Sequence, residues 1–245
     1  MNPPPVSKRI LYEDNHIVVI NKWPGEIIQA DKTMDEALCE TLKFFIKERD
    51  QKPGNVFVGV PHRLDRPVSG AVIFAKTGKA LERFNKMFSC RDIQKKYWAI
   101  TTEKPQPESG QLKHYLVRNT EQNKSYAYPR IKPNAKEALL NYRYMGGSEH
   151  YHFVEIELLT GRHHQIRAQL SAIGCSVKGD LKYGASRSNP DGGISLHARS
   201  LSFLHPVKQI PIEIVAPVPE DVLWKLFIRL QENRSYYAPL PVLGE

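Results

Sequence analysis

A polar loop ahead of the apolar run 71–75 holds the first residues suited to chemistry, His62-Arg63-Leu64-Asp65-Arg66. Arg63 and Arg66 flank Asp65 and favour its ionised form, because a nearby positive charge stabilises a carboxylate. An ionised carboxylate can act as a nucleophile or as a base. The alternative is an exposed ion pair of little energetic worth, which is the commoner outcome for an isolated Arg-x-Asp-Arg pattern.

A second polar segment, Thr160-Gly161-Arg162-His163-His164-Gln165-Ile166-Arg167, leads into a predicted helix. Ile166, Leu170 and Ile173 fall on one helical face, with Thr160 as the expected N-cap and Gly174 as the expected end. Arg167 lies at the edge of this buried face, where an unpaired charge is costly, so we expect it to have an anionic partner. Arg162 and the first-turn amides offer a further site for an anion.

Other catalytic classes have little support in the sequence. His163 and His164 are adjacent, so on a helix they would point about 100° apart, and no third metal ligand has suitable spacing. We therefore expect no metal and no cofactor. Neither a serine-hydrolase motif nor a glycine-rich phosphate loop is present. A glycoside hydrolase would need a second carboxylate, and Asp180, the nearby candidate, lies in a turn where a structural role is more common.

Short strands and amphipathic helices alternate between these segments. Residues 10–12 and 17–21 predict a β-hairpin, and Thr33 to Glu36 has capping-box spacing ahead of a helix. A second helix is expected around 81–88, and a last one from Pro219, burying Val222, Leu223, Leu226, Phe227 and Leu230. Further strands are expected at 71–75, 97–100, 154–158 and 210–214.

This order of elements predicts an α+β fold, because hairpin-length links outnumber helix-length crossovers. We expect a mixed, largely antiparallel central sheet flanked by helices. No linker interrupts residues 9–233, which predicts one domain. Residues 1–8 are expected to form a flexible Pro-rich N-terminus, and residues 234–245 a C-terminal tail.

The charge of the chain favours a polyanionic partner. The formal net charge is +9, of which the stretch 95–136 supplies +6, with nine Lys or Arg residues and three acids. Tyr115, Tyr126 and Tyr128 are interleaved with these cations. Cations bind phosphates and aromatic faces stack on unpaired bases, so this stretch suits structured RNA. The alternative is a solvated hairpin with incidental tyrosines.

Targeting signals are not evident in the sequence. No apolar run approaches the roughly 20 residues that span a bilayer, and the Pro-rich start does not resemble a secretion signal. The three cysteines form no Cys-x-x-Cys pair. We therefore expect a cytoplasmic protein without a membrane partner. No exposed heptad pattern is evident, so we expect a monomer.

Six motifs, in the same order, resemble those of the RluA-type RNA pseudouridine synthases and cover about residues 10–217. They are Asn21-Lys22-Trp23-Pro24-Gly25, His62-Arg63-Leu64-Asp65-x-x-x-Ser69-Gly70, Lys96-x-Trp98 around Tyr97, Gly161-Arg162-x-His164-Gln165-Ile166-Arg167, Gly179-Asp180-x-x-Tyr183-Gly184, and Leu196-His197-Ala198 through His205-Pro206.

The resemblance implies an enzyme that detaches uracil from ribose in RNA and rejoins it through carbon, without a cofactor or a metal. It assigns the catalytic carboxylate to Asp65, its arginine partner to Arg167 and the catalytic tyrosine to Tyr97. We expect Arg63 to enter the RNA stack when the base flips out, with His62 near the same phosphates. Leu196 is expected to form an apolar wall for uracil. Lys22 is either a contact to the RNA backbone or a solvated turn residue.

Two positions depart from the family pattern. Pro67-Val68 stands where Asp-Thr is usual, which removes a hydroxyl beside the catalytic loop, and His163 stands where a small hydroxyl residue is common. The chain begins at the first family strand, so we expect RNA affinity to come from this domain, including the stretch 95–136. The main alternative function is a catalytically silent RNA-binding protein on the same scaffold.

Overall fold

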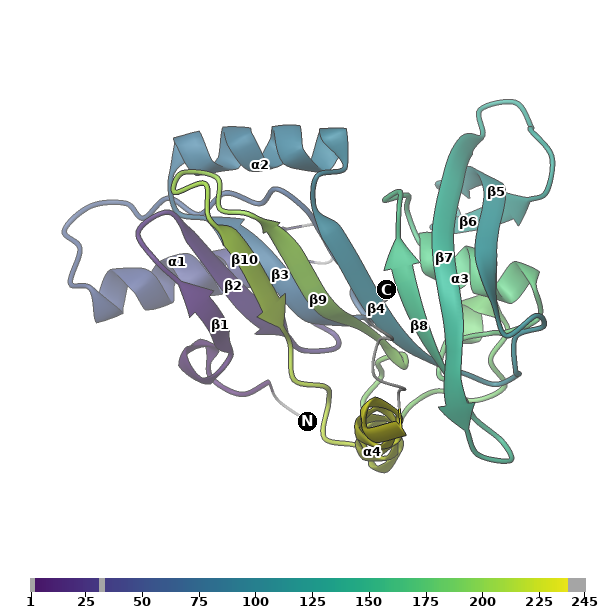
Figure 1. Ribbon diagram of the computed structural model, residues 1–245. Coiled ribbons are helices and arrows are strands. Elements are labelled where there is room, and N and C mark those ends of the chain that lie inside the picture. The colour runs from purple at the N-terminus through teal and green to yellow at the C-terminus, as the bar shows by residue number, and fades with distance from the viewer. Residues whose placement is uncertain (1–2, 31–33, 238–245) are drawn as a thin grey trace, which may run out of the picture.

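A single β-sheet of ten strands runs through the computed structural model, which describes residues 3–30 and 34–237 (Figure 1). The strands are β1 (Ile10–Glu13), β2 (Ile17–Lys22), β3 (Ser69–Ala75), β4 (Gln94–Thr101), β5 (Ser109–Asn119), β6 (Lys124–Tyr128), β7 (Lys136–Gly147), β8 (His152–Leu158), β9 (Leu196–Leu204) and β10 (Pro211–Val215). The helices are α1 (Leu38–Arg49), α2 (Gly78–Cys90), α3 (Gln165–Ala172) and α4 (Val222–Tyr237), with short 3-10 helices η1 (Val6–Lys8) and η2 (Leu181–Tyr183).

The sheet is mixed and largely antiparallel, and the predicted α+β class is confirmed. Its strands follow the order β1-β2-β3-β9-β4-β8-β7-β5-β6, with β10 paired to β9. Only the short β3–β9 pair is parallel among the strand pairs of the described residues. This pair joins the half of the sheet built from β1–β3 to the half that contains β4–β8. Strands remote in sequence therefore meet at the middle of the sheet.

Helices cover both faces of the sheet, so several strands are buried on both sides. In β2, Val18 and Ile20 pack in the α1 cluster, whereas Ile17 and Val19 pack in the α2 cluster. Strand β4 shows the same alternation. Tyr97 and Ala99 face the α3 side, and Trp98 and Ile100 face α4. Figure 1 shows α2 above one half of the sheet, α3 beside the other half and α4 below the middle.

The predicted hairpin of β1 and β2, the two helices α1 and α2, and the central strands are all present. Helix α1 begins at Leu38 with Ala37 as its N-cap, so the capping box is wrong; Thr33 itself lies outside the described residues. The N-terminus is more ordered than expected, because Val6 in η1 is 5% exposed and packs in the α1 cluster.

The last helix buries part of the predicted face: Phe227 is buried and Leu223 and Leu230 pack against its cluster, as expected, but Val222 and Leu226 are exposed. Val222 is 78% exposed and Leu226 is 36% exposed, whereas Trp224 and Phe227 are buried. The two aromatic rings are three residues apart and pack on Trp98 and Phe153 of the sheet, so the largest side chains determine the rotation of the helix. Helix α4 continues to Tyr237, past the domain boundary expected at residue 233; residues 238–245 lie outside the described chain.

Gly70 allows the two halves of the sheet to meet. It pairs with Ala198 in the parallel β3–β9 ladder and has a φ of +114°. A Cβ atom at this position would lie 2.4 Å from the carbonyl oxygen of Ala198. Only glycine combines this backbone conformation with such a close approach. The position lies five residues after Asp65, so the constraint also fixes the end of the loop that carries Asp65.

We predict that Gly70→Ala lowers the free energy of unfolding by roughly 2–4 kcal/mol, because it adds backbone strain and a steric clash. Gly54→Ala is the matched control, since a Cβ there meets nothing within 4 Å. Urea unfolding at neutral pH measures both variants. Equal stabilities for the two variants would contradict the role assigned to Gly70.

Candidate active site

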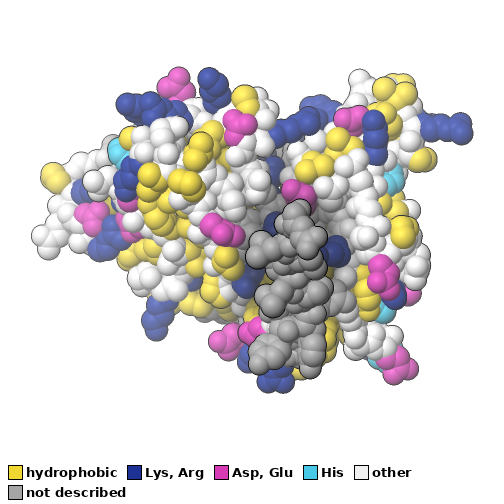
Figure 2. All heavy atoms as spheres, viewed as in Figure 1, with side chains coloured by type: hydrophobic (Ala, Val, Ile, Leu, Met, Phe, Trp, Pro, Cys, Tyr) yellow, Lys and Arg dark blue, Asp and Glu magenta, His cyan; other side chains and the backbone are white. Residues whose placement is uncertain are grey.

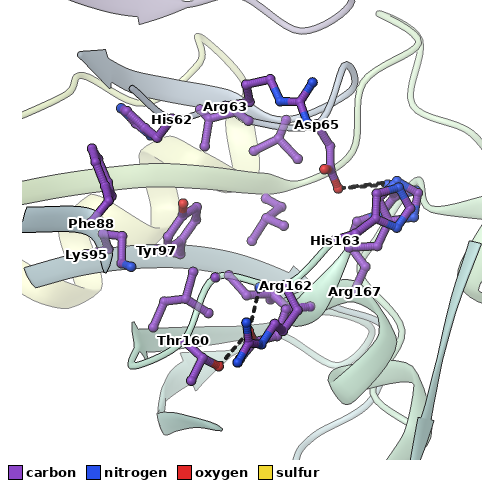
Figure 3. A pocket seen from close by; sticks show the side chains of 18 of the residues that line it. His62, Arg63, Asp65, Phe88, Lys95, Tyr97, Thr160, Arg162, His163 and Arg167 are labelled. Carbon is purple, nitrogen blue, oxygen red and sulfur yellow. Dashed lines mark hydrogen bonds and ion pairs between the residues drawn. The ribbon is translucent and has the colours of Figure 1, made fainter. Parts of the chain in front are cut away.

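A cavity of about 690 Å³ lies where the two halves of the sheet meet. Its walls come from the loop 61–68, the C-terminal end of α2, strand β4, the segment 158–167 and Leu196 at the start of β9. Figure 3 shows Asp65 at one end of this cavity, with Tyr97 between Asp65 and Lys95. The fold therefore brings together Asp65, Tyr97 and Arg167, the three residues that the sequence assigns to catalysis.

Asp65 begins a tight turn in the loop 61–68, and its side chain points into the cavity. The amide of Val68 donates to the carbonyl oxygen of Asp65 over 3.0 Å, which closes this turn. The Asp65 side chain is 26% exposed, and its Oδ2 lies 3.0 Å from Nη1 of Arg167. The anionic partner expected for Arg167 is therefore present. Because Nη1 and Oδ2 are hydrogen-bonded, the carboxylate has a fixed direction towards the cavity.

Arg167 has a second carboxylate partner that the sequence analysis did not assign to it. Its Nε and Nη2 donate to Asp180 over 2.6 and 2.9 Å, which is a bidentate pair, and its guanidinium lies 4.9 Å from the ring centroid of Tyr183. Burial alone would lower the pKa of Arg167, but hydrogen bonding to Asp180 and the charges of Asp180 and Asp65 raise it overall. The guanidinium therefore stays charged.

His164 lies beside the same carboxylate and is held neutral. Its Nε2 lies 3.7 Å from Oδ2 of Asp65, and its Nδ1 lies 3.0 Å from the hydroxyl of Tyr183. Burial, followed by the nearby charge of Arg167, lowers the pKa of His164 to about 2. The Tyr183 hydroxyl also bonds to the backbone of Ser125, which ties strand β6 to the site.

His163 and His164 lie before the helix, so their side chains do not point about 100° apart as adjacent residues on a helix would. His164 precedes α3 with a left-handed backbone (φ 53°), and its ring stacks on that of His163 with centroids 3.8 Å apart. His163 in turn bonds to Ser125 and Asn123, so its departure from the family pattern adds contacts to the β5–β6 hairpin. Among residues 3–30 and 34–232, no group of three potential ligands could hold a metal ion.

Thr160 is not the N-cap of α3, which begins only at Gln165. Its hydroxyl instead donates to Oε1 of Gln165 and accepts from the amide of Leu139, which holds the segment 160–165 against β7. Arg162 lines the cavity, and its Nε donates to the carbonyl oxygen of Glu137. The loop before the helix is thus ordered by hydrogen bonds and presents Arg162 to the cavity.

Tyr97 and Leu196 lie on the same face of the neighbouring strands β4 and β9 and belong to one apolar cluster in the cavity wall. Tyr97 is 8% exposed and Leu196 is 3% exposed. Burial and the negative charge of Asp65 raise the pKa of Tyr97, so its phenol keeps its proton at neutral pH. The Val68 side chain packs in the same cluster. Valine has the shape of the threonine that is usual in the family. Its methyl groups pack in the cluster, so this position keeps its apolar contacts and loses only the hydroxyl.

His62 and Arg63 differ in what they offer to a ligand. Arg63 is exposed at the rim of the cavity. His62 accepts a hydrogen bond at Nε2 from the amide of Ile73 and stacks on Phe88 with ring centroids 4.6 Å apart. Burial lowers the pKa of His62 to about 3. A neutral ring whose Nε2 is an acceptor carries its proton on Nδ1, so it offers one donor and no charge.

The expectation that Lys22 contacts RNA or solvent is wrong. Lys22 is 1% exposed, and its Nζ donates to the carbonyl oxygens of Trp23, Arg66 and Val68 over 3.0, 2.9 and 2.6 Å. Burial lowers the pKa of Lys22 to about 7. Three acceptors match the three protons of an ammonium group. Lys22 therefore holds the loop that carries Asp65 through its backbone. The burial of β2 on both faces was the signal for this location.

Comparison with known proteins identifies the family to which this chain belongs. Residues 16–172 match the family described as RNA pseudouridylate synthase. The ribosomal large subunit pseudouridine synthase D of Xylella fastidiosa is 31% identical over 96% of this chain and 73% of its own length. An RNA pseudouridine synthase of Chlorobaculum parvum, described as uncharacterized, is also 31% identical, over 90% of this chain and 73% of its own length.

Solved structures share the fold. Human RNA pseudouridylate synthase domain containing 4 superimposes with a TM-score of 0.74 at 24% sequence identity, over 93% of each chain. The fold and the matches together define an isomerase that acts on RNA. The chain belongs to the RNA pseudouridine synthase family, of the RluA type. No helix among the described residues is long and apolar enough to cross a membrane.

The buried pair of Arg167 and Asp180 predicts a large effect of a small substitution. We predict that Asp180→Asn lowers the free energy of unfolding by roughly 3–5 kcal/mol, because it leaves a buried guanidinium without its bidentate partner. Asp92→Asn, at an exposed carboxylate, is the control and should change stability by less than about 0.5 kcal/mol. Chemical denaturation at pH 7 measures both. A loss below 1 kcal/mol for Asp180→Asn would contradict this account.

Proposed function

We propose that this enzyme isomerises specific uridines in structured ribosomal or transfer RNA, with Asp65 as the catalytic carboxylate. The observation that carries the proposal is the hydrogen bond from Arg167 to Asp65 at the end of a cavity lined by Tyr97. The cavity volume falls in the range of sites that enclose a small organic group. Relatives named ribosomal large subunit pseudouridine synthases D and C support ribosomal RNA as one substrate class.

The chemistry follows from the charge that develops during the reaction. Detachment of uracil leaves the sugar carbon electron-poor, and a carboxylate next to it can attack that carbon or remove a neighbouring proton. Arg167 orients Asp65 and keeps it ionised. The protonated phenol of Tyr97 packs on the uracil and helps to move the proton away from the rejoined carbon. No metal or cofactor is required for these steps.

Recognition is proposed to use base flipping. A uridine within folded RNA has to leave its stack before Asp65 can reach its sugar. Arg63 is exposed at the rim, which supports its entry into the vacated position. Leu196 and Tyr97 then enclose the base, and Arg162 faces the adjoining phosphates. His62 is neutral, so it can offer the RNA a hydrogen bond from Nδ1 but no positive charge.

The remaining RNA contacts are proposed to come from the strands β5–β7. Lys and Arg side chains project from the upper edge of the molecule over these strands and over α2 (Figure 2). Lys124 lies over the rings of Tyr126 and Tyr183, and Lys132 lies over that of Tyr128. The cations and the aromatic faces are therefore adjacent, as an RNA surface requires. We propose that the protein acts as a cytoplasmic monomer.

Two alternatives receive less support. A glycoside hydrolase needs a second free carboxylate, but Asp180 is 1% exposed and fully engaged with Arg167. A catalytically silent RNA-binding protein would have no reason to keep Asp65, Tyr97 and Arg167 around one cavity. The comparison of wild type with a single carboxylate variant separates the silent protein from the enzyme.

We predict that Asp65→Asn abolishes pseudouridine formation and leaves RNA affinity within about tenfold of wild type, since the other cavity residues remain. Purified protein is incubated with unmodified transfer RNA and ribosomal RNA transcripts, and pseudouridine is mapped afterwards. Asp92→Asn is the matched carboxylate control and should retain activity. Near-normal turnover by Asp65→Asn would refute the site assignment, and release of free uracil would favour the hydrolase.

A second prediction concerns the basic surface over β6 and the loop that follows it. Replacement of Lys124, Arg130 and Lys132 by Gln should weaken RNA binding and reduce the salt slope by about 2–3, because each phosphate contact releases roughly one counterion. The control replaces Lys8, Lys47 and Lys52, exposed cations near α1, by Gln. Binding measured between 50 and 200 mM salt distinguishes the two. An unchanged slope for the first variant would remove this surface from the RNA interface.

A further inference from the structure

A buried lysine in the cavity has no part in the chemistry described above. Lys95 is 8% exposed and lines the same cavity as Asp65. Within the described part of the chain, no carboxylate pairs with its ammonium group and no protein oxygen accepts a hydrogen bond from it. Its Nζ lies 6.0 Å from the ring centroid of Phe88. The stem of Lys95 is buried, whereas its ammonium group opens on the cavity without a protein acceptor, so a ligand that enters the cavity can supply one.

The groups around Lys95 also favour a ligand that supplies a hydrogen-bond acceptor. His62 is held neutral, and Arg91 at the end of α2 adds a second positive charge to the same wall. Burial, and then the charge of Arg91, lower the pKa of Lys95. None of these neighbours accepts a proton or balances a charge. This end of the cavity therefore favours an oxygen acceptor, most strongly one that carries negative charge.

The position of Lys95 relative to Asp65 is set by strand β4. Lys95 and Tyr97 are two residues apart, so their side chains lie on the same face of the strand, whereas Lys96 is exposed on the opposite face. Figure 3 shows Lys95 at the end of the cavity opposite Asp65, with Tyr97 between them. A planar base that packs on Tyr97 with its sugar at Asp65 therefore extends towards Lys95.

The geometry of uracil supplies an acceptor at this end throughout the reaction. In the six-membered ring, C4 lies opposite N1, so O4 points directly away from the glycosidic bond of uridine. In pseudouridine the sugar is attached to C5, and the atom opposite C5 is C2, which carries O2. A fixed donor across the ring from the sugar therefore meets a carbonyl oxygen both before and after the base turns.

We propose that Lys95 is a catalytic residue that donates a hydrogen bond to the uracil carbonyl oxygen opposite the bond being broken or formed. The proposal rests on the function proposed for Asp65 and Tyr97. When the N1–C1′ bond breaks, its electron pair stays on uracil and is shared by O2 and O4. The ring then bonds to C1′ through C5, C5 loses its proton, and N1 gains one. The positive charge of Lys95 stabilises uracil while it is detached.

The first test compares Lys95→Met with Lys47→Met, which removes the same charge from an exposed position on α1, away from the cavity. Under single-turnover conditions on a mapped RNA substrate, Lys95→Met should slow pseudouridine formation by about a hundredfold or more. RNA affinity should stay within about threefold, and the unfolding temperature should not fall, because the variant keeps a buried stem and removes an ammonium group without a protein acceptor. Lys47→Met should stay within about threefold in rate.

The second test separates substrate contact from support of the strand. An RNA with 4-thiouridine at the target position offers sulfur, a weaker acceptor, in place of O4. This change should slow the wild type by about tenfold and Lys95→Met by less than twofold, because the variant has already lost the hydrogen bond. Lys47→Met should respond to the thio substitution as the wild type does.

The outcomes are distinguishable from those of the proposed function. Near-normal turnover by Lys95→Met would overturn the role of Lys95 and leave Asp65 unaffected. A slow variant with a lowered unfolding temperature and an undiminished thio effect would indicate a structural role instead, which also overturns the proposal. Absence of pseudouridine with the wild-type protein would refute the function itself, and the inference with it.

Discussion

The guanidinium of Arg167 is shared by two carboxylates, and the arrangement of the cavity depends on this contact. Asp180 takes the buried side of the group in a bidentate pair, which leaves Nη1 directed at Asp65. One partner therefore anchors the arginine, and the other is oriented by it. A lone arginine at this depth would carry a large desolvation cost, and a lone Asp65 would lack a fixed direction. The turn that carries Asp180 is thus as much a part of the site as the loop that carries Asp65.

The sheet topology brings Asp65 and Arg167 into contact. Asp65 and Arg167 are 102 residues apart in sequence, and they meet because the parallel β3–β9 pair joins the two halves of the sheet. Gly70 permits that junction, and Lys22 binds three carbonyl oxygens next to it. Each of these groups holds backbone rather than substrate. The loop that carries Asp65 is consequently held through its backbone, while the Asp65 side chain is left accessible from the cavity.

The sequence predicts much of the fold and the main residues of the site. It does not predict the further contacts that hold those residues in place, such as the pair of Arg167 and Asp180. Apolar periodicity located the helices and six of the ten strands but not β5, β6, β7 or β9. The cost of a buried charge required an anion for Arg167. The same pattern could not show that Asp180 and Asp65 share one guanidinium, because that depends on tertiary packing. The apolar periodicity also indicated the positions of two lysines, which the sequence analysis did not use. Lys22 continues a strand buried on both faces, and Lys95 shares the inward face of β4 with Tyr97. Helix α4 shows the opposite case, since periodicity placed Val222 and Leu226 in the core, whereas the structure buries Trp224 beside the expected Phe227.

The most direct test of this account is a crystal structure of the protein bound to an RNA hairpin that contains its target uridine. We expect the uridine to be flipped out of the RNA, with uracil packed on Tyr97 and Leu196 and C1′ of the ribose next to Asp65. Arg167 should still bind both Asp65 and Asp180. A complex in which the uridine stays stacked in the RNA, or in which Arg167 leaves Asp180 to bind a phosphate, would contradict the account.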